Sequence, residues 1–195
     1  MKIRMKIGIA FLLIFILCGC AAPHEFAGPE LSAPHPVPDV ELMSASGPVR
    51  LSDFQGKYLF VYFGYTFCPD VCPLTLSTLQ SVRKKMPEEA SQIQVVMISV
   101  DPERDTPEVL AKYMSYFDDT FVGITGSSEE IASIGEPFGL FYEKGEGSAA
   151  TGYLISHSAR AYLIDPEGNA RVAYPHGATD DQIIADLKYL FEIES

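Results

Sequence analysis

The chain has 195 residues, of which 47% are hydrophobic, and its formal net charge at pH 7 is −12. This length and composition are typical of a single globular domain with a substantial core. The acidic excess argues against nucleic acid as a partner, because few cations are available to neutralise phosphates.

The N-terminus has the pattern of an export signal. Three basic residues within the first six precede an apolar run from Ile7 to Leu17, which is short for a membrane-spanning helix. The run leads into Cys-Gly-Cys at residues 18–20, which resembles a bacterial lipobox. This resemblance implies a cleaved signal peptide over residues 1–19 and a lipid on Cys20. The protein would then be anchored to the cell membrane and face the periplasm or the extracytoplasmic side. An uncleaved signal anchor is the alternative.

Residues 20–37 are predicted to form a tether. Four prolines and few large apolar residues favour an extended segment that lifts the folded domain off the membrane. His24 and His35 lie in this segment, and we interpret them as solvated linker histidines. The folded domain is predicted over residues 38–195.

The predicted domain begins with a β-hairpin from Asp39 to Leu51 and then alternates strands with helices. The predicted strands cover residues 58–63, 93–100, 121–124, 159–164 and 170–174. The predicted helices cover residues 74–86, 107–117, 129–135 and 180–193. Glycines and charged residues predict that most of residues 138–152 form an exposed loop. This order indicates an α/β protein with a thioredoxin-like fold, in which helices cover both faces of a mixed sheet.

Cys68 and Cys72 are the two cysteines of the predicted domain. They lie between an apolar strand and an amphipathic helix, whose unpaired N-terminal N–H groups favour thiolate over thiol. A disulfide between residues only four positions apart would restrain the unfolded chain little, so a purely stabilising role is weak. The pair therefore indicates redox chemistry or the binding of a soft metal.

A histidine could complete a copper site with these cysteines. Two thiolates suit Cu(I), and a neutral imidazole would allow the site to hold Cu(II) as well. His157 immediately precedes a predicted strand, which in a thioredoxin-like fold begins beside the cysteine turn. His176 is interpreted as a loop histidine.

Other candidates have weaker patterns. Asp70 lies between the cysteines and could tune a thiolate or bind Cu(II), or it could be a turn residue that bonds backbone amides. Asp101 and Asp105 are interpreted as loop and helix-cap residues rather than ligands, and Thr106 is the alternative cap of the helix that starts at Pro107. Four methionines at apolar positions are predicted to pack in the core: Met43, Met86, Met97 and Met114.

Four motifs occur together in the chain: FGYTFCPDVCP, SVDPERDTP, VGITGS and YLISHS…YLIDPEG. This set resembles the Sco (SenC/PrrC-type) family of copper-binding assembly proteins, from about Gly47 to the C-terminus. The resemblance implies a thioredoxin fold, Cys68, Cys72 and His157 as copper ligands, and a role in loading the binuclear copper centre of cytochrome c oxidase subunit II. Ser156 stands where that family usually has Asp.

Two functions remain open from the sequence. The first is a copper chaperone, which is not an enzyme and passes Cu(I) or Cu(II) to an acceptor by ligand exchange. The second is a thiol-disulfide oxidoreductase that reduces the acceptor's cysteines, with Cys68 attacking and Cys72 resolving. The two activities can coexist, because copper requires the reduced dithiol. The acidic surface predicts a monomeric domain.

Overall fold

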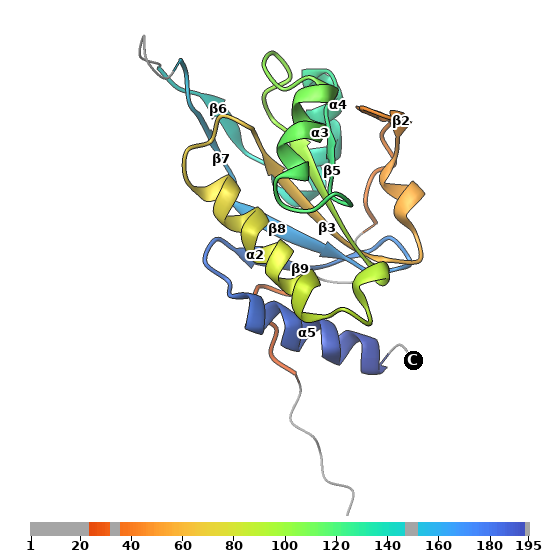
Figure 1. The fold of residues 1–195 in the computed structure, drawn as a ribbon. Helices are drawn as coiled ribbons and strands as arrows, with labels where there is room; N and C mark the ends of the chain where they lie inside the picture. Colours follow the sequence, from red (N-terminus) through yellow and green to blue (C-terminus); the bar gives the residue numbers. More distant parts are fainter. Residues whose placement is uncertain (1–23, 32–35, 147–151, 194–195) are drawn as a thin grey trace, which may run out of the picture.

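A five-stranded mixed sheet forms the centre of the protein (Figure 1). The computed structural model describes residues 24–31, 36–146 and 152–193, so the predicted signal peptide, Cys20 and His35 lie outside the described residues. The strand order is β5-β4-β3-β8-β9. The strands are β3 (Tyr58–Gly64), β4 (Ile93–Ser99), β5 (Val122–Ile124), β8 (Arg160–Ile164) and β9 (Ala170–Pro175).

The two central strands, β3 and β4, are parallel and buried along their whole length. Their near-continuous apolar sequences are those of strands covered on both faces. The pairing runs from Tyr58 opposite Ile93 to Gly64 opposite Ser99, so both strands end together. The two loops that follow, one with the cysteines and one with the DPERD motif, therefore meet at the same edge of the sheet.

Four helices are described: α2 (Val71–Lys85), α3 (Pro107–Ser115), α4 (Ser128–Gly135) and α5 (Asp180–Ile193). Successive side chains of β3 point to opposite faces of the sheet. Tyr62 points towards α2, where its hydroxyl reaches Cys72, whereas Phe63 packs against Phe138, which follows α4. Helical segments therefore cover both faces, and the predicted thioredoxin-like fold is confirmed.

Two small two-stranded sheets lie outside the central sheet. The predicted N-terminal hairpin is confirmed as β1 (Leu42–Ser44) and β2 (Gly47–Val49). The second sheet pairs β6 (Tyr142–Lys144) with β7 (Ile155–His157) and was not predicted. The expectation of an exposed loop over residues 138–152 is thus wrong for β6, because this strand is specified by its distant partner rather than by its own sequence.

The described part of the predicted tether packs on the domain. The segment 28–31 lies along β9: the Leu31 N–H donates to the Arg171 carbonyl, and the Ala173 N–H donates to the Pro29 carbonyl. The His24 ring stacks on Tyr189, and its Nε2 lies 2.7 Å from the buried Asp186 carboxylate. His24 is therefore not a solvated linker residue. The domain boundary itself stays a prediction.

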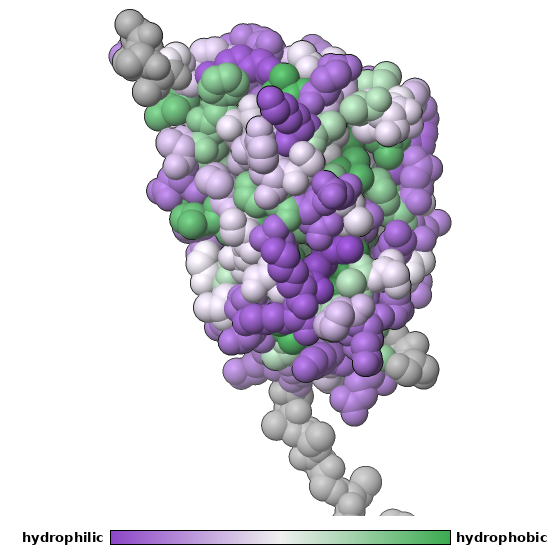
Figure 2. Space-filling model, viewed as in Figure 1, coloured by the Kyte–Doolittle hydropathy of each residue, from purple (hydrophilic) through white to green (hydrophobic). Residues whose placement is uncertain are grey.

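Three of the four methionines predicted to be in the core are buried. Met43 is the exception, because it lies on the β-hairpin with 42% of its surface exposed. Hydrophilic residues cover much of the face of the molecule shown in Figure 2, and apolar surface occurs there in smaller separate areas. Within the residues that the structure describes, none of the helices is both long and apolar enough to span a bilayer.

Candidate metal centre

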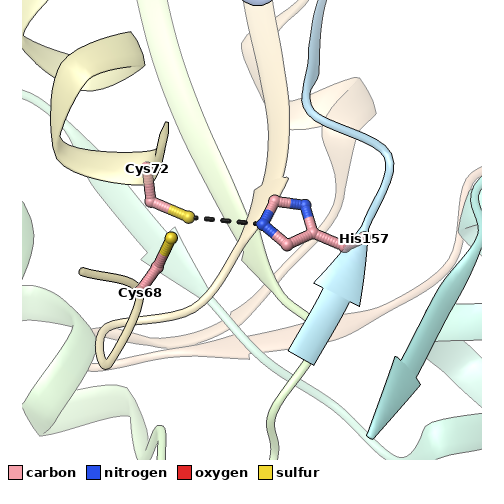
Figure 3. Close-up of side chains that lie close together, drawn as sticks. All are labelled: Cys68, Cys72 and His157. Carbon is pink, nitrogen blue, oxygen red and sulfur yellow. Dashed lines mark hydrogen bonds between the residues drawn. The ribbon is translucent and has the colours of Figure 1, made fainter. Parts of the chain in front are cut away.

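The structure brings Cys68, Cys72 and His157 together at the edge of the sheet where β3 ends (Figure 3). Their two sulfurs and one ring nitrogen all lie within 4.8 Å of one another. The cysteines and the histidine come from opposite ends of the domain sequence, and only folding places them side by side.

The two cysteines differ in their surroundings. Cys68 lies in the turn after β3, where its N–H donates to the Tyr65 carbonyl at 3.3 Å. Cys72 lies in the first turn of α2 and is completely buried. Both are free thiols. The expected order of strand, turn and helix is confirmed, but the helix begins at Val71 rather than at residue 74, so Cys72 lies inside it and not in the turn.

The sulfur pair shares one proton. A hydrogen bond from the Cys72 thiol lowers the pKa of Cys68 to about 3, although burial opposes this shift. The backbone amides of Asp70 and Cys72 also stabilise the Cys68 thiolate. Conversely, the bond to Cys68 and burial raise the pKa of Cys72. At neutral pH the pair is therefore a Cys68 thiolate that accepts from a Cys72 thiol.

His157 presents one specific nitrogen to the sulfurs. Its Nδ1 lies 3.2 Å from the Ser158 carbonyl oxygen, which can only accept, so the proton of the neutral ring is assigned to Nδ1. Nε2 then carries the lone pair, and it lies 3.4 Å from the Cys72 sulfur. This arrangement holds the imidazole in the tautomer that a metal requires.

Two neighbours of Cys72 were missed by the sequence reasoning. The Tyr62 hydroxyl donates to the Cys72 sulfur at 3.4 Å, and burial raises the pKa of Tyr62, so the group remains a donor. Gly64 leaves room for that sulfur, because a Cβ added there would lie 3.1 Å from Cys72 Sγ and 2.7 Å from a Tyr62 ring carbon. The apolar strand pattern gave no signal for either role.

Asp105 supports the cysteine turn from the neighbouring loop. Its carboxylate accepts from the Thr66 N–H at 3.0 Å, from the Thr66 hydroxyl at 2.5 Å and from the Ser99 hydroxyl at 2.6 Å. Burial raises the pKa of this carboxyl. The helix cap of α3 is Thr106, so of the two predicted cap residues Thr106 is confirmed and Asp105 is wrong.

The remaining candidates lie outside the cluster of donor atoms. Asp70 is exposed and its side chain makes no hydrogen bond to the start of α2, so neither interpretation of that side chain is supported. Asp101 is buried and bonds Arg104 and Tyr153 rather than joining the donor atoms. His176 is exposed between β9 and α5, as expected of a loop histidine.

The donor set fits a copper ion. Two sulfurs and one neutral imidazole are soft to borderline ligands, which suit Cu(I) and also hold Cu(II). Cys68 supplies an already ionised sulfur, and binding at Cys72 would release one proton. The carboxylates nearest in sequence, which hard cations prefer, are not in the cluster.

Comparisons with known proteins give a consistent result. A sequence profile described as SCO1/SenC matches residues 30–192. The mitochondrial SCO2 homologue of Bos taurus is 35% identical over 153 residues, which cover 77% of this chain and 58% of that protein.

Solved structures are also similar to this chain. Apo Sco1 from Thermus thermophilus is 40% identical with a TM-score of 0.77, over 87% of this chain and 99% of that one. The copper-bound ScoI of Bradyrhizobium japonicum is 33% identical with a TM-score of 0.71, over 78% of this chain and 98% of that one.

Proposed function

Because the chain belongs to the SCO1/SenC family, we propose that it is a copper chaperone that binds one copper ion through Cys68, Cys72 and His157. The family membership expected from the four motifs is thereby confirmed. Copper is the cargo of this protein rather than a resident cofactor. The acceptor we propose is the binuclear copper centre of cytochrome c oxidase subunit II.

The observation that carries the proposal is the convergence of two sulfurs and one unprotonated imidazole nitrogen within 4.8 Å. A structural disulfide would need no histidine at this place. The Nδ1 contact with Ser158 orients the ring so that its lone pair faces the sulfurs. This is the arrangement of a metal ligand rather than of a core histidine.

The location of the site supports delivery. The cysteine turn and β7 lie at the edge of the domain (Figure 1), and His157 is partly exposed. An acceptor's donor atoms can therefore approach the metal from the histidine side, while Cys72 remains buried. Ligand exchange through shared sulfurs then moves the ion without releasing it to solvent.

The remaining parts of the proposal concern location. We propose that Cys20 carries the lipid and that residues 1–19 are removed, which would anchor the protein to the cell membrane on its extracytoplasmic side. The lipobox-like sequence supports this part of the proposal. Mass spectrometry of the membrane-extracted protein should find an N-terminal diacylglyceryl cysteine, and a Cys20→Ala variant should lose it.

The central experiment is a Cu(I) titration of the full chain, reduced and purified in detergent. We expect one copper per chain for the wild type and severe loss of binding when Cys68 and Cys72 are both replaced by Ser. The His157→Ala variant should bind Cu(I) at least about 10–100-fold more weakly, because loss of a ligand should cost no less than loss of a residue that only orients one. Unchanged affinity in His157→Ala, or a stoichiometry other than one, would contradict the assigned ligand set.

A second function is favoured by the ionisation of the two sulfurs. The Cys68 thiolate can attack a disulfide of the acceptor, which forms a mixed disulfide and releases one acceptor thiolate. Cys72 then loses its proton and attacks the Cys68 sulfur, which releases the second acceptor thiol and leaves this chain oxidised. We therefore propose thiol-disulfide exchange as an accompanying activity.

The two activities are separable by mutation. The His157→Ala variant should lose copper affinity and still reduce a test disulfide, because the imidazole takes no part in the exchange of sulfur bonds. Cys72→Ser should trap the mixed disulfide on Cys68, visible by mass spectrometry. Absence of that adduct would rule out the proposed exchange activity and would not count against the proposed copper site.

A further inference from the structure

Building on the proposed copper site, we propose that Arg104 is a positioning residue that holds the strand bearing His157 against the cysteine turn. Arg104 lies in the loop after β4, and its side chain is 18% exposed. It belongs to neither ligand-bearing segment. Its guanidinium lies between the two segments and contacts both.

On the histidine side, Arg104 contacts the residue that leads into β7. Its Nη1 donates to the Tyr153 backbone carbonyl at 3.0 Å, and its guanidinium lies 3.7 Å from the centre of the Tyr153 ring. Tyr153 is four residues before His157. A flat cation stacked on a ring and bonded to the same residue's backbone fixes that residue in both distance and direction.

On the cysteine side, the same guanidinium lies 4.6 Å from the centre of the Phe67 ring and 5.9 Å from that of Tyr65. Phe67 is the residue immediately before Cys68, and Tyr65 begins the turn. One cation therefore links the two aromatic residues that precede Cys68 to the residue that precedes β7.

Asp101 fixes the guanidinium itself. Its carboxylate is almost completely buried, accepts from Arg104 Nε, and also accepts from the Tyr153 hydroxyl at 2.7 Å. Asp101, Arg104 and Tyr153, which we call the Arg104 clamp, therefore each contact the other two. A buried carboxylate in such a clamp restricts the rotamers of the arginine and the tyrosine together.

The clamp acts on the side of β7 that the central sheet does not hold. In the part of the chain that the structure describes, β7 pairs with β6, and this two-stranded sheet is separate from the sheet that contains β3. After His157 the chain enters β8, which pairs with β3, so the C-terminal side of β7 is fixed through the central sheet. On the N-terminal side, β7 reaches the cysteine turn through side chains, including a hydrogen bond from the Ile155 N–H to the Tyr65 hydroxyl at 3.2 Å. The approach of this side of β7 to the cysteine turn therefore depends on side-chain contacts such as those of Arg104.

The test compares Arg104→Ala and Arg104→Lys with a matched control, Arg50→Ala. Arg50 also forms ion pairs with acidic residues, but it lies beside the N-terminal hairpin and is far more exposed. The first readout needs no metal: amide hydrogen exchange of Ile155 in the full-length apo protein. Exchange should accelerate by about tenfold or more in Arg104→Ala, less in Arg104→Lys, and not in Arg50→Ala, while amides of β3 and β4 keep their protection.

The second readout is the Cu(II) form, studied by pulsed electron paramagnetic resonance. In the wild type we expect the coupling of one imidazole nitrogen. In Arg104→Ala that coupling should weaken or become heterogeneous, and Cu(II) affinity should fall by about 10–100-fold. A merely structural role would leave the nitrogen coupling of the folded fraction unchanged.

Tyr153 provides a second route if Arg104→Ala does not fold. Tyr153→Leu removes the stacking surface, whereas Tyr153→Phe keeps it and loses only the hydroxyl's bonds to Asp101 and Glu103. The proposal predicts a larger effect on both readouts in Tyr153→Leu than in Tyr153→Phe. Wild-type exchange at Ile155 and wild-type nitrogen coupling in the Arg104 and Tyr153→Leu variants would overturn it. If the wild type binds no copper, the proposed function fails, and exchange at Ile155 alone decides whether the clamp exists.

Discussion

The two halves of the candidate copper site are held by different means. The cysteine half is part of the core: β3 pairs on both sides within the central sheet, and α2 covers it. The histidine half is carried by a short two-stranded sheet. This sheet continues into β8 of the central sheet after His157, and the Arg104 clamp and a bond to Tyr65 hold its other side. This difference indicates that the sulfurs are the fixed end of the site and His157 the adjustable end. Such a division suits a protein that must bind an ion and then release it.

The largest effect we expect is from breaking the support of the cysteine half with Asp105→Ala. This change leaves one N–H and two hydroxyl groups without their acceptor, and each buried orphan costs about 1–3 kcal/mol. We predict a fall of about 3 kcal/mol or more in the free energy of unfolding, measured by chemical denaturation. Asp118→Ala is the matched control, because Asp118 bonds the N–H and hydroxyl of Thr120 in a more exposed place. Equal losses in the two variants would contradict a special role for the loop after β4.

The next effect comes from filling the space beside Cys72. Gly64→Ala would bring a methyl group to 3.1 Å from the sulfur, so Cys72 or the Tyr62 ring must move. Overpacking of a buried site lowers the free energy of unfolding by about 1–3 kcal/mol. We expect the affinity for Cu(I) to fall as well, because the Cys72 sulfur is displaced. The same change immediately after β6, Gly145→Ala, would place the added Cβ 3.4 Å from the Leu154 carbonyl oxygen, which is an ordinary contact, and should be close to neutral. A neutral Gly64→Ala would show that the cysteine half can adapt as easily as the histidine half.

A pH profile tests the shared proton of the cysteine half. The ordinary cysteine pKa is about 8.5. Below that pH the unfolded chain binds a proton at Cys68 that the native state, with its pKa of about 3, does not bind, so stability rises with pH across this window. Above pH 8.5 the unfolded Cys72 ionises while the native Cys72 keeps its proton, so stability falls again. The pair's contribution should therefore be greatest near pH 8.5.

This contribution is the difference between wild type and the double variant with Cys68→Ser and Cys72→Ser. Denaturation of both proteins from pH 5 to pH 10, with reductant present, cancels the titration of the other groups. A difference that stays flat with pH would contradict the assignment of thiolate to Cys68 and thiol to Cys72.

The smallest effect concerns the residue beside the histidine. Ser156 lies directly opposite Glu143 in the β6–β7 pairing, so Ser156→Asp would place two carboxylates face to face. Like charges in cross-strand pairs are destabilising, and we expect a loss of about 0.5 kcal/mol in local stability, seen as faster amide exchange in β7. Adding Glu143→Gln to Ser156→Asp should restore the wild-type exchange. The absence of any change would show that the pair formed by residues 143 and 156 does not contribute to the stability of the β6–β7 sheet.

The sequence predicted the cysteine half well and the histidine half only in part. The strand before the cysteines and the helix after them follow from continuous apolar and amphipathic patterns, which are local signals. The strand β6 could not be predicted in this way, because it is defined by pairing with β7 across a segment of glycines and charged residues. The local sequence likewise places His24 in a linker. Its partners Tyr189 and Asp186 are at the opposite end of the chain, so no local pattern indicates these contacts.

The amino-acid sequence by itself determined the helices and strands other than β6 and β7, the family and the three candidate ligands, because motifs and hydrophobic periodicity are properties of neighbouring residues. Tertiary structure alone decided which nitrogen of His157 faces the sulfurs, which cysteine is the thiolate, and that Asp101 and Asp105 are buried supports. It also placed Arg104 between the two halves of the site. The physical reason is that tautomer, ionisation and stacking depend on distances between groups that are far apart in the chain.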